Sequence, residues 1–355
     1  MGIKGFSKVF EKSSKEIKLS KIKDKSVAVD ASIIMFKSCL GMNNINALTD
    51  SNGNSTIHIN VIISKILNFE KCNIKQYWVF DYFERGYENP DKVLEHTKRK
   101  TIKDNSIKKL KKLTDQKLKN DLFSESDEDT DNEEISKKDT DDKLISKKDT
   151  IQKQIYTQEK IGFSINDRIV SDTKYILDCF NIPWCDSLKN VEAESVCSAL
   201  TNTGLCDSVF STDTDAMAYG AKELIRDVKV AKKKALMSYK LSDVLSDNSI
   251  DINDLRKIAV ILGTDHAVKT KGIGIKTVLK KFKDVELTEG QLNAIKIFET
   301  PVEISKLKWN NDDDENSSDE LYYDTPFIKH KINKLLNWLE GKSFNRERIE
   351  KQIKK

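Results

Sequence analysis

Three short apolar segments of this chain each run into an aspartate, and this pattern limits the folds that the chain can adopt. The segments are Ser26–Asp30, Tyr77–Asp81 and Ser208–Asp213. Short continuous apolar runs are typical of strands that are buried on both faces in a parallel sheet. The ligands of an open parallel sheet gather outside the carboxyl ends of its strands. We therefore expect the three aspartates to lie at one edge of a sheet.

Helical periodicity fills the stretches between these segments. The helical patterns include residues 57–70, 169–180 and 191–201. Because strands and helices alternate, the sequence predicts an α/β fold with a mainly parallel sheet. No apolar run approaches the roughly 18 residues that a membrane span needs, so a transmembrane protein is excluded. No secretory signal is evident either.

Four further carboxylates stand in comparable local contexts. They are Glu192, Glu194, Asp215 and Asp265. The two glutamates fall in the first turn of an expected helix, and the two aspartates follow apolar runs. Seven carboxylates in one pocket would repel one another unless cations neutralised them, and oxygen ligands without Cys or His suit Mg²⁺ or Mn²⁺ rather than zinc. Each carboxylate could instead be a cap, a turn residue or a solvated charge.

The six cysteines do not form a zinc-binding pattern. No two of them are spaced as C-x2-C or C-x4-C. Without a secretory signal, we expect reduced and mostly buried thiols in an intracellular protein.

Charge is strongly segregated although the whole chain is nearly neutral, with 61 Lys and Arg against 57 Asp and Glu. Residues 92–119 carry 11 basic and 3 acidic side chains, whereas residues 123–150 carry 5 basic and 11 acidic ones. The acidic stretch also repeats residues 135–140 word for word as residues 145–150. We expect a basic helical segment followed by a disordered acidic insert, because the insert offers little apolar surface to offset the entropy of ordering.

Several strings resemble the flap endonuclease and XPG family of structure-specific DNA nucleases. The strings are Met1–Phe6, Val27–Ser32, Val79–Asp81, Val191–Ser195, Ser211–Asp215, Leu262–Asp265 and Lys271–Thr277. They span nearly all of the chain outside the acidic insert. The resemblance implies a PIN-like nuclease core, in which helices flank a mainly parallel central sheet. It also implies a helical arch and a helix-hairpin-helix-like region that binds duplex DNA.

The resemblance implies that seven carboxylates bind two divalent ions, Mg²⁺ or alternatively Mn²⁺. These carboxylates are Asp30, Asp81, Glu192, Glu194, Asp213, Asp215 and Asp265. Two ions about 4 Å apart can generate a hydroxide and stabilise charge on both the entering and the leaving oxygen of a phosphodiester.

Lys92 and Arg99 are the catalytic cations that the resemblance implies. They stand seven residues apart, which is two helical turns, so both point from one face of a helix. In the family, a Lys and an Arg at this spacing contact the scissile phosphate. The alternative is that they are two of the eleven cations on a nonspecific DNA-binding helix.

Six residues are expected to contact DNA. They are Gly2, Phe36, Gly272, Ile273, Gly274 and Lys276. Phe36 stands where the family has a ring that stacks on an unpaired base, and an ordinary core Phe is the alternative. The glycine turn would let backbone N–H groups approach a phosphate, and in the family it also holds K⁺.

The resulting domain prediction has four regions. Residues 1–120 form an N-terminal nuclease region with a basic arch, residues 121–155 a disordered acidic insert, and residues 156–300 an internal nuclease region with the duplex-binding turn. Residues 301–355 form a C-terminal helical region with an acidic loop and a basic end. The insert is expected to be an inert tether, with competition for DNA or recruitment of partners as alternatives.

The function expected from the resemblance is metal-dependent cleavage of 5′ flaps or branched duplexes in DNA replication, repair or recombination. A noncatalytic DNA-binding scaffold, a 5′ exonuclease, a Holliday-junction resolvase and an RNA-directed 5′ nuclease are the alternatives. Residues 344–355 contain no Gln-x-x-aliphatic-x-x-aromatic-aromatic string, so sliding-clamp binding is not expected. We expect a monomer in the nucleus or another DNA-replicating compartment, or in the host cell if the chain is viral.

Overall fold

Within the described residues, seven strands form a single mixed sheet. The computed structural model describes residues 2–40, 49–82, 90–125, 137–230, 233–311 and 326–353. The strands are β1 (Lys15–Ile17), β2 (Ser26–Asp30), β3 (Lys75–Phe80), β4 (Trp184–Asp186), β5 (Ser208–Phe210), β6 (Glu223–Val230) and β7 (Lys233–Lys240). Their order in the sheet is β1-β7-β6-β5-β2-β3-β4.

The five strands from β6 to β4 in this order run parallel, and β7 and β1 add antiparallel pairs at one edge. The prediction of a mainly parallel α/β fold is therefore confirmed. β2 has the predicted bounds, whereas Asp81 and Asp213 fall just beyond the ends of β3 and β5. Because β2 lies between β3 and β5, all three predicted aspartates emerge at the same edge of the sheet.

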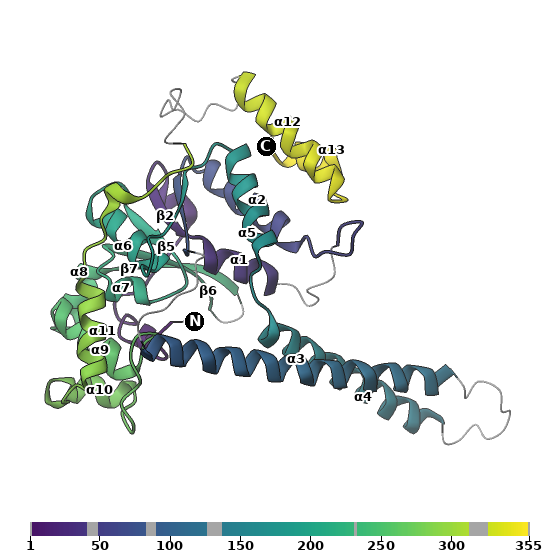
Figure 1. Cartoon of the computed structure of the whole chain (residues 1–355), viewed down its shortest axis with the longest axis horizontal. Helices are drawn as coiled ribbons and strands as arrows, with labels where there is room; N and C mark the ends of the chain where they lie inside the picture. Colours follow the sequence, from purple (N-terminus) through teal and green to yellow (C-terminus); the bar gives the residue numbers. More distant parts are fainter. Residues whose placement is uncertain are drawn as a thin grey trace.

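Helices cover both faces of the sheet (Figure 1). One face packs against α1 (Ala31–Leu40), α2 (Ile57–Glu70) and α5 (Asp167–Cys179), and the other against α6 (Ala193–Asn202), α7 (Asp215–Ala218) and α9 (Ile252–Leu262). Alternation along β2 explains this division, since Val27 and Val29 point into the first core and Ala28 points into the second. All three side chains are fully buried.

The remaining elements extend these two layers. They are α8 (Leu241–Asn248), α10 (Ile275–Lys281), α11 (Glu289–Glu299), α12 (Pro326–Gly341), α13 (Arg346–Ile353) and the short 3₁₀ helices Phe6–Lys8, Leu19–Ile22, Phe282–Asp284 and Ile304–Lys306. Helix α12 packs against α5, and α10 and α11 pack against α9. The six cysteines are free thiols, and five of them are buried. In the described ranges, none of the helices has both the length and the apolar character that crossing a bilayer requires.

A long helical hairpin projects from this body (Figure 1). It consists of α3 (Pro90–Glu125) and α4 (Lys137–Gly162). Leu113 of α3 packs on Ile151 and Ile155 of α4, and the Ser106 hydroxyl donates a hydrogen bond to the Gln158 carbonyl over 2.8 Å. These contacts make the two helices antiparallel neighbours.

The hairpin corrects the expectation of disorder across residues 121–155. Residues 121–125 and 137–155 are helical, and residues 126–136 lie outside the described residues. The low-complexity composition concealed Ile151 and Ile155, which are four residues apart and therefore share one helix face. That face has a partner in α3, so apolar burial supports a helix that its composition alone does not predict. The predicted acidic loop at residues 312–320 also lies outside the described residues.

A buried ionic network ties α2, α5 and the end of α12 together. The Asp172 carboxylate lies 3.0 Å from Nε2 of His58, 3.4 Å from Nζ of Lys342 and 3.5 Å from Nη1 of Arg168. His58 is 1% exposed and Asp172 is 6% exposed. Burial alone would raise the pKa of Asp172, but the hydrogen bond to His58 and the surrounding positive charges lower it.

We predict that Asp172→Asn lowers the free energy of unfolding by about 3 kcal/mol at pH 7, because it leaves the buried His58 and the half-buried Arg168 and Lys342 without their carboxylate. A lowered pKa stabilises the folded state above the ordinary pKa of an aspartate, and this stabilisation is lost as the pH falls through the lowered value. The difference between wild type and variant should therefore close only below about pH 4. Urea denaturation measures it. Asp167→Asn, in the exposed first turn of the same helix, is the matched control and should change stability by less than about 1 kcal/mol.

Candidate metal centre

Asp30 is the most deeply buried carboxylate at the sheet edge. It ends β2 and is 0% exposed. The Ser211 hydroxyl donates to its Oδ2 over 2.8 Å, and the backbone N–H of Ile33 donates to its Oδ1 over 3.2 Å. Burial, followed by the negative charge of Asp81, raises the pKa of Asp30 to about 8 despite these two hydrogen bonds.

Asp81 connects three elements around Asp30. Its Oδ2 accepts from the Ser32 hydroxyl over 2.6 Å, and its Oδ1 accepts from the backbone N–H of Ala193 over 3.1 Å. The second bond satisfies a free N–H group at the start of α6 and places a negative charge at the positive end of that helix. Unlike Asp30, Asp81 is exposed, so the site opens to solvent on this side.

Glu194 lies among the other carboxylates. It occupies the first turn of α6, as predicted, whereas Glu192 is one step earlier than predicted, at the N-cap of that helix. Loss of hydration raises the pKa of Glu194 well above its usual range, and the charges of its neighbours raise it further. The neighbours, in order of decreasing effect, are Asp30, Asp81, Asp213 and Glu192.

Asp213 and Asp215 form a linked pair after β5. The backbone N–H of Asp215 donates to Oδ1 of Asp213 over 3.1 Å. Both residues are buried, at 6% and 9% exposure. Burial and the charge of Asp213 raise the pKa of Asp215 well above its usual range.

The amino-terminal residues close over this aspartate pair. The backbone N–H of Ile3 donates to Oδ1 of Asp215 over 3.0 Å. Gly2 has a φ of +84°, and a Cβ at this position would collide with Oδ1 of Asp213. Gly2 was predicted to contact DNA, and in the structure it packs against Asp213, a predicted metal ligand.

Glu192 is held by two side chains that the sequence analysis did not identify. The Tyr219 hydroxyl donates to Oε2 of Glu192 over 2.9 Å, and Nε2 of His266 lies 3.1 Å from the same oxygen. Tyr219 and His266 lie 27 and 74 residues from Glu192 in the chain, so the three residues form no sequence motif. The only sequence signal was that His266 directly follows Asp265.

Asp265 pairs with the base of the helical hairpin. Nη2 of Arg99 donates to Oδ1 of Asp265 over 2.5 Å. Arg99 lies in α3, so this contact brings one of the two predicted catalytic cations to the predicted metal ligands. Lys92 lies two turns earlier in the same helix, and its side chain is outside the part of the chain that the structure describes.

The structure therefore brings six of the seven carboxylates close enough to interact electrostatically, namely Asp30, Asp81, Glu192, Glu194, Asp213 and Asp215. We call these six residues the carboxylate cluster. Asp265 is adjacent to it, because the next residue, His266, contacts Glu192. In the described ranges, no group of three or more His, Cys, Asp or Glu side chains is close enough to hold a metal ion as it stands. The hydroxyls of Ser32 and Ser211 and backbone N–H groups donate hydrogen bonds to these carboxylates. A donor set of oxygens alone, with raised pKa values, fits a hard divalent cation that would draw them together.

The other predicted DNA contacts lie on α1 and at the start of α10. Phe36 is partly buried in α1, and its ring centroid is 5.8 Å from that of Phe163. Gly272 has a φ of +77° with open space around it, and Gly274 is the N-cap of α10, which carries the exposed Lys276. Ile273 packs partly against the core. Contact of these residues with DNA stays a prediction.

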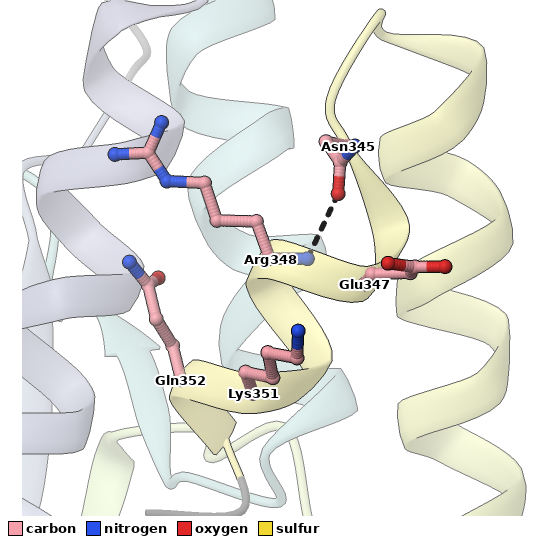
Figure 2. Close-up of a pocket in the computed structure, with 5 residues that line it drawn as sticks. All are labelled: Asn345, Glu347, Arg348, Lys351 and Gln352. Atoms are coloured by element: carbon pink, nitrogen blue, oxygen red, sulfur yellow. Dashed lines mark hydrogen bonds between the residues drawn. The ribbon is translucent and has the colours of Figure 1, made fainter.

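A hollow at the carboxyl-terminal helix is separate from this centre. Figure 2 shows that it is lined by five residues of the α13 region. These are Asn345, Glu347, Arg348, Lys351 and Gln352. The marked hydrogen bond, from the backbone N–H of Arg348 to the Asn345 side chain over 2.9 Å, is a helix cap. None of the predicted site residues lines this hollow.

Comparisons with known proteins agree with the fold and with the family resemblance. The model of the XPG N-terminal domain matches residues 1–114, and the model of the XPG I-region matches residues 181–265. Flap endonuclease 1 of Cryptosporidium muris is 27% identical over 94% of this chain and 71% of its own length. Flap endonuclease 1 of Sulfolobus acidocaldarius is 26% identical over 84% of this chain and 80% of its own length.

Solved structures show the same fold. The flap endonuclease-1 structure from Methanococcus jannaschii superposes with a TM-score of 0.62 at 21% identity, covering 96% of this chain and 94% of that one. The catalytic core of Rad2 in complex with a DNA substrate superposes with a TM-score of 0.59 at 13% identity, covering 99% of both chains.

A parallel sheet with carboxylates at its carboxyl edge, matched by two XPG models over more than half of the chain, defines a metal-dependent DNA nuclease. The chain belongs to the flap endonuclease and XPG family of structure-specific nucleases. The family and fold predictions are confirmed. The assignment of individual carboxylates to metal ions stays a prediction.

The raised pKa values predict an unusual pH dependence of stability. A carboxyl whose pKa is raised on folding holds a proton that the unfolded chain releases, so the folded state loses stability as the pH rises from about 4 towards 8. In a chelator, the melting temperature of wild type should fall over this range more than that of Asp30→Asn. Added Mg²⁺ should raise the melting temperature of wild type, most strongly at pH 8, and should raise that of Asp30→Asn only a little. Equal Mg²⁺ stabilisation of both proteins would contradict the assignment of Asp30.

A second prediction concerns Gly2. Gly2→Ala should weaken Mn²⁺ binding about tenfold or more, because the added methyl group displaces the Asp213 carboxylate. Gly204→Ala is the matched control. Gly204 has nearly the same φ, +85°, with no atom within 4 Å of an added Cβ, so it carries only the backbone cost. Mn²⁺ titration followed by electron paramagnetic resonance measures both, and equal affinities would contradict the contact.

Proposed function

We propose that this chain hydrolyses a single phosphodiester in duplex DNA that carries a 5′ single-stranded flap or branch, leaving 5′-phosphate and 3′-hydroxyl ends. The observation that carries the proposal is the contact between Arg99 and Asp265. It places the base of a basic helical hairpin against a cluster of acidic side chains. Membership of a family of structure-specific nucleases supports it.

The proposed cofactors are two Mg²⁺ ions, which Mn²⁺ can replace. When bound, they would supply a hydroxide near neutral pH and stabilise charge on the reacting oxygens. The protein itself would position the ions and neutralise the charge that develops on the phosphate. The carboxylate cluster would hold the ions, and Arg99, with Lys92 on the same helix face, would donate hydrogen bonds to phosphoryl oxygens as charge develops there.

The α3–α4 hairpin supports the preference for a single-stranded end. The exposed lysines of α3 include Lys98, Lys100, Lys108 and Lys109. A strand that passes along this surface would release counterions, so binding should weaken steeply as salt rises. The turn at Gly272–Gly274, followed by exposed lysines on α10, is the proposed duplex site, with K⁺ as its proposed ion.

We also propose a monomer that acts in a DNA-replicating compartment of the cell, in replication, repair or recombination. Residues 344–355 contain no sliding-clamp motif. The four predicted regions stay a proposal, with the second one now containing the outer part of the hairpin. A noncatalytic scaffold, a 5′ exonuclease, a Holliday-junction resolvase and an RNA-directed nuclease are the alternatives.

A cleavage panel tests the proposal. We expect cleavage of a 5′-flap DNA in Mg²⁺ and none in a chelator, with slower cutting of 3′-flap, bubble, nicked and four-way DNA and of an RNA flap. Asp213→Asn should abolish cleavage. Arg99→Ala should lower kcat about 100-fold or more, because it removes a donor to the developing charge.

The control for Arg99 is Lys100→Ala. Lys100 is the next residue and points about 100° away around the helix, so this variant should weaken DNA binding slightly and leave kcat unchanged. Cleavage retained in Asp213→Asn would contradict the metal assignment. Tight binding of flapped DNA without cleavage by wild type would favour the noncatalytic scaffold.

A further inference from the structure

Two side chains from separate elements converge on a single oxygen of Glu192. The Tyr219 hydroxyl lies 2.9 Å from Oε2, and Nε2 of His266 lies 3.1 Å from Oε2 and 3.1 Å from the Tyr219 hydroxyl. Tyr219 is the C-cap of α7, and His266 follows α9. The three groups form a closed triangle, which we call the Glu192 clamp.

The hydrogen-bond pattern assigns the direction of each bond. A carboxylate can only accept, so both the tyrosine hydroxyl and Nε2 of His266 must donate to Oε2. Nδ1 of His266 is buried and has no hydrogen-bond partner in the described structure. A hydrogen on Nδ1 would therefore lack an acceptor, and the tautomer that fits carries its hydrogen on Nε2.

Burial and ring packing fix the clamp in place. Tyr219 is 8% exposed and His266 is 4% exposed. The Phe298 ring packs edge-on against both, with centroids 4.8 Å from Tyr219 and 6.0 Å from His266. The two donors can therefore move little relative to Glu192, and a hydroxyl directed at this half-buried carboxylate adds orientation as well as energy.

The clamp also links two predicted metal ligands. His266 directly follows Asp265, and its backbone N–H donates to Oγ1 of Thr264 over 3.1 Å, which closes the turn that carries Asp265. Glu192, at the N-cap of α6, is thus connected through one imidazole to the turn after α9.

We infer that Tyr219 and His266 are positioning residues that hold Glu192 in the orientation required to bind a divalent cation. This inference rests on the proposed function, since it takes Glu192 to be a metal ligand. Groups that orient metal ligands typically contribute 10- to 100-fold to metal affinity. Neither residue touches the DNA or the reacting atoms in this scheme.

The test measures Mn²⁺ binding by electron paramagnetic resonance, without DNA. Tyr219→Phe keeps the ring and removes only the donor, and it should weaken Mn²⁺ binding about tenfold. Tyr239→Phe is the matched control. Tyr239 is 6% exposed and packs edge-on against Phe10, near Arg226 and away from Glu192, so its loss of a hydroxyl should leave Mn²⁺ affinity unchanged.

Rescue by a conservative variant separates positioning from packing. His266→Gln can place an amide N–H near the position of Nε2 and should retain most of the Mn²⁺ affinity, whereas His266→Leu should lose about tenfold or more. In cleavage assays, Tyr219→Phe and His266→Leu should need more Mg²⁺ for half-maximal rate. Their KM for flapped DNA at saturating Mg²⁺ should stay that of wild type. Melting temperatures in a chelator check that each variant is folded.

Several outcomes would overturn the inference. An unchanged Mn²⁺ affinity in Tyr219→Phe would overturn it. Equal losses of Mn²⁺ affinity in His266→Gln and His266→Leu would also overturn it, because a loss of packing alone would then explain both. Mn²⁺ binding by wild type without cleavage of any branched DNA would contradict the proposed function instead. In that case the affinities of the four variants would still decide whether the clamp positions Glu192.

Discussion

Negatively charged carboxylates lie close together at the carboxyl ends of the parallel strands, and the surrounding structure must hold them there against their mutual repulsion. Asp30, Asp213 and Asp215 are buried, and the pKa values of Asp30, Glu194 and Asp215 are raised by dehydration and by one another. Hydroxyl groups and backbone N–H groups offset part of this cost. The remainder would favour binding of a cation, because a positive ion would reduce the repulsion between these carboxylates.

The framework that opposes this repulsion is drawn from distant parts of the chain. Ser211 bonds Asp30 across 181 residues, the N–H of Ile3 bonds Asp215 across 212 residues, and the N–H of Ala193 bonds Asp81 across 112 residues. None of these contacts can form before β2, β3 and β5 align. The buried cores on the two faces of the sheet stabilise that alignment, so the site is complete only when the sheet has formed.

The sequence predicted correctly those elements whose formation depends on neighbouring residues. β2 and α2 have their predicted bounds, because apolar runs and helical periodicity are properties of neighbouring residues. The clamp on Glu192 was missed, because it joins residues with no common motif. Helix α4 was missed because its charges outnumber the two isoleucines that pack on Leu113. The family resemblance identified the seven acidic residues. The order of the strands explains why six of them lie close together. Sequence periodicity alone does not predict metal binding.

The shape of the α3–α4 hairpin has a mechanical consequence. With 36 residues, α3 is a rod about 54 Å long, and Arg99 lies only about 14 Å from its start. A 10° tilt about that start would sweep the far tip through roughly 9 Å but shift Arg99 by only about 2 Å, given a rise of 1.5 Å per residue. If α3 tilted in this way, its outer end would move several times farther than Arg99, so the contact between Arg99 and Asp265 would be disturbed least.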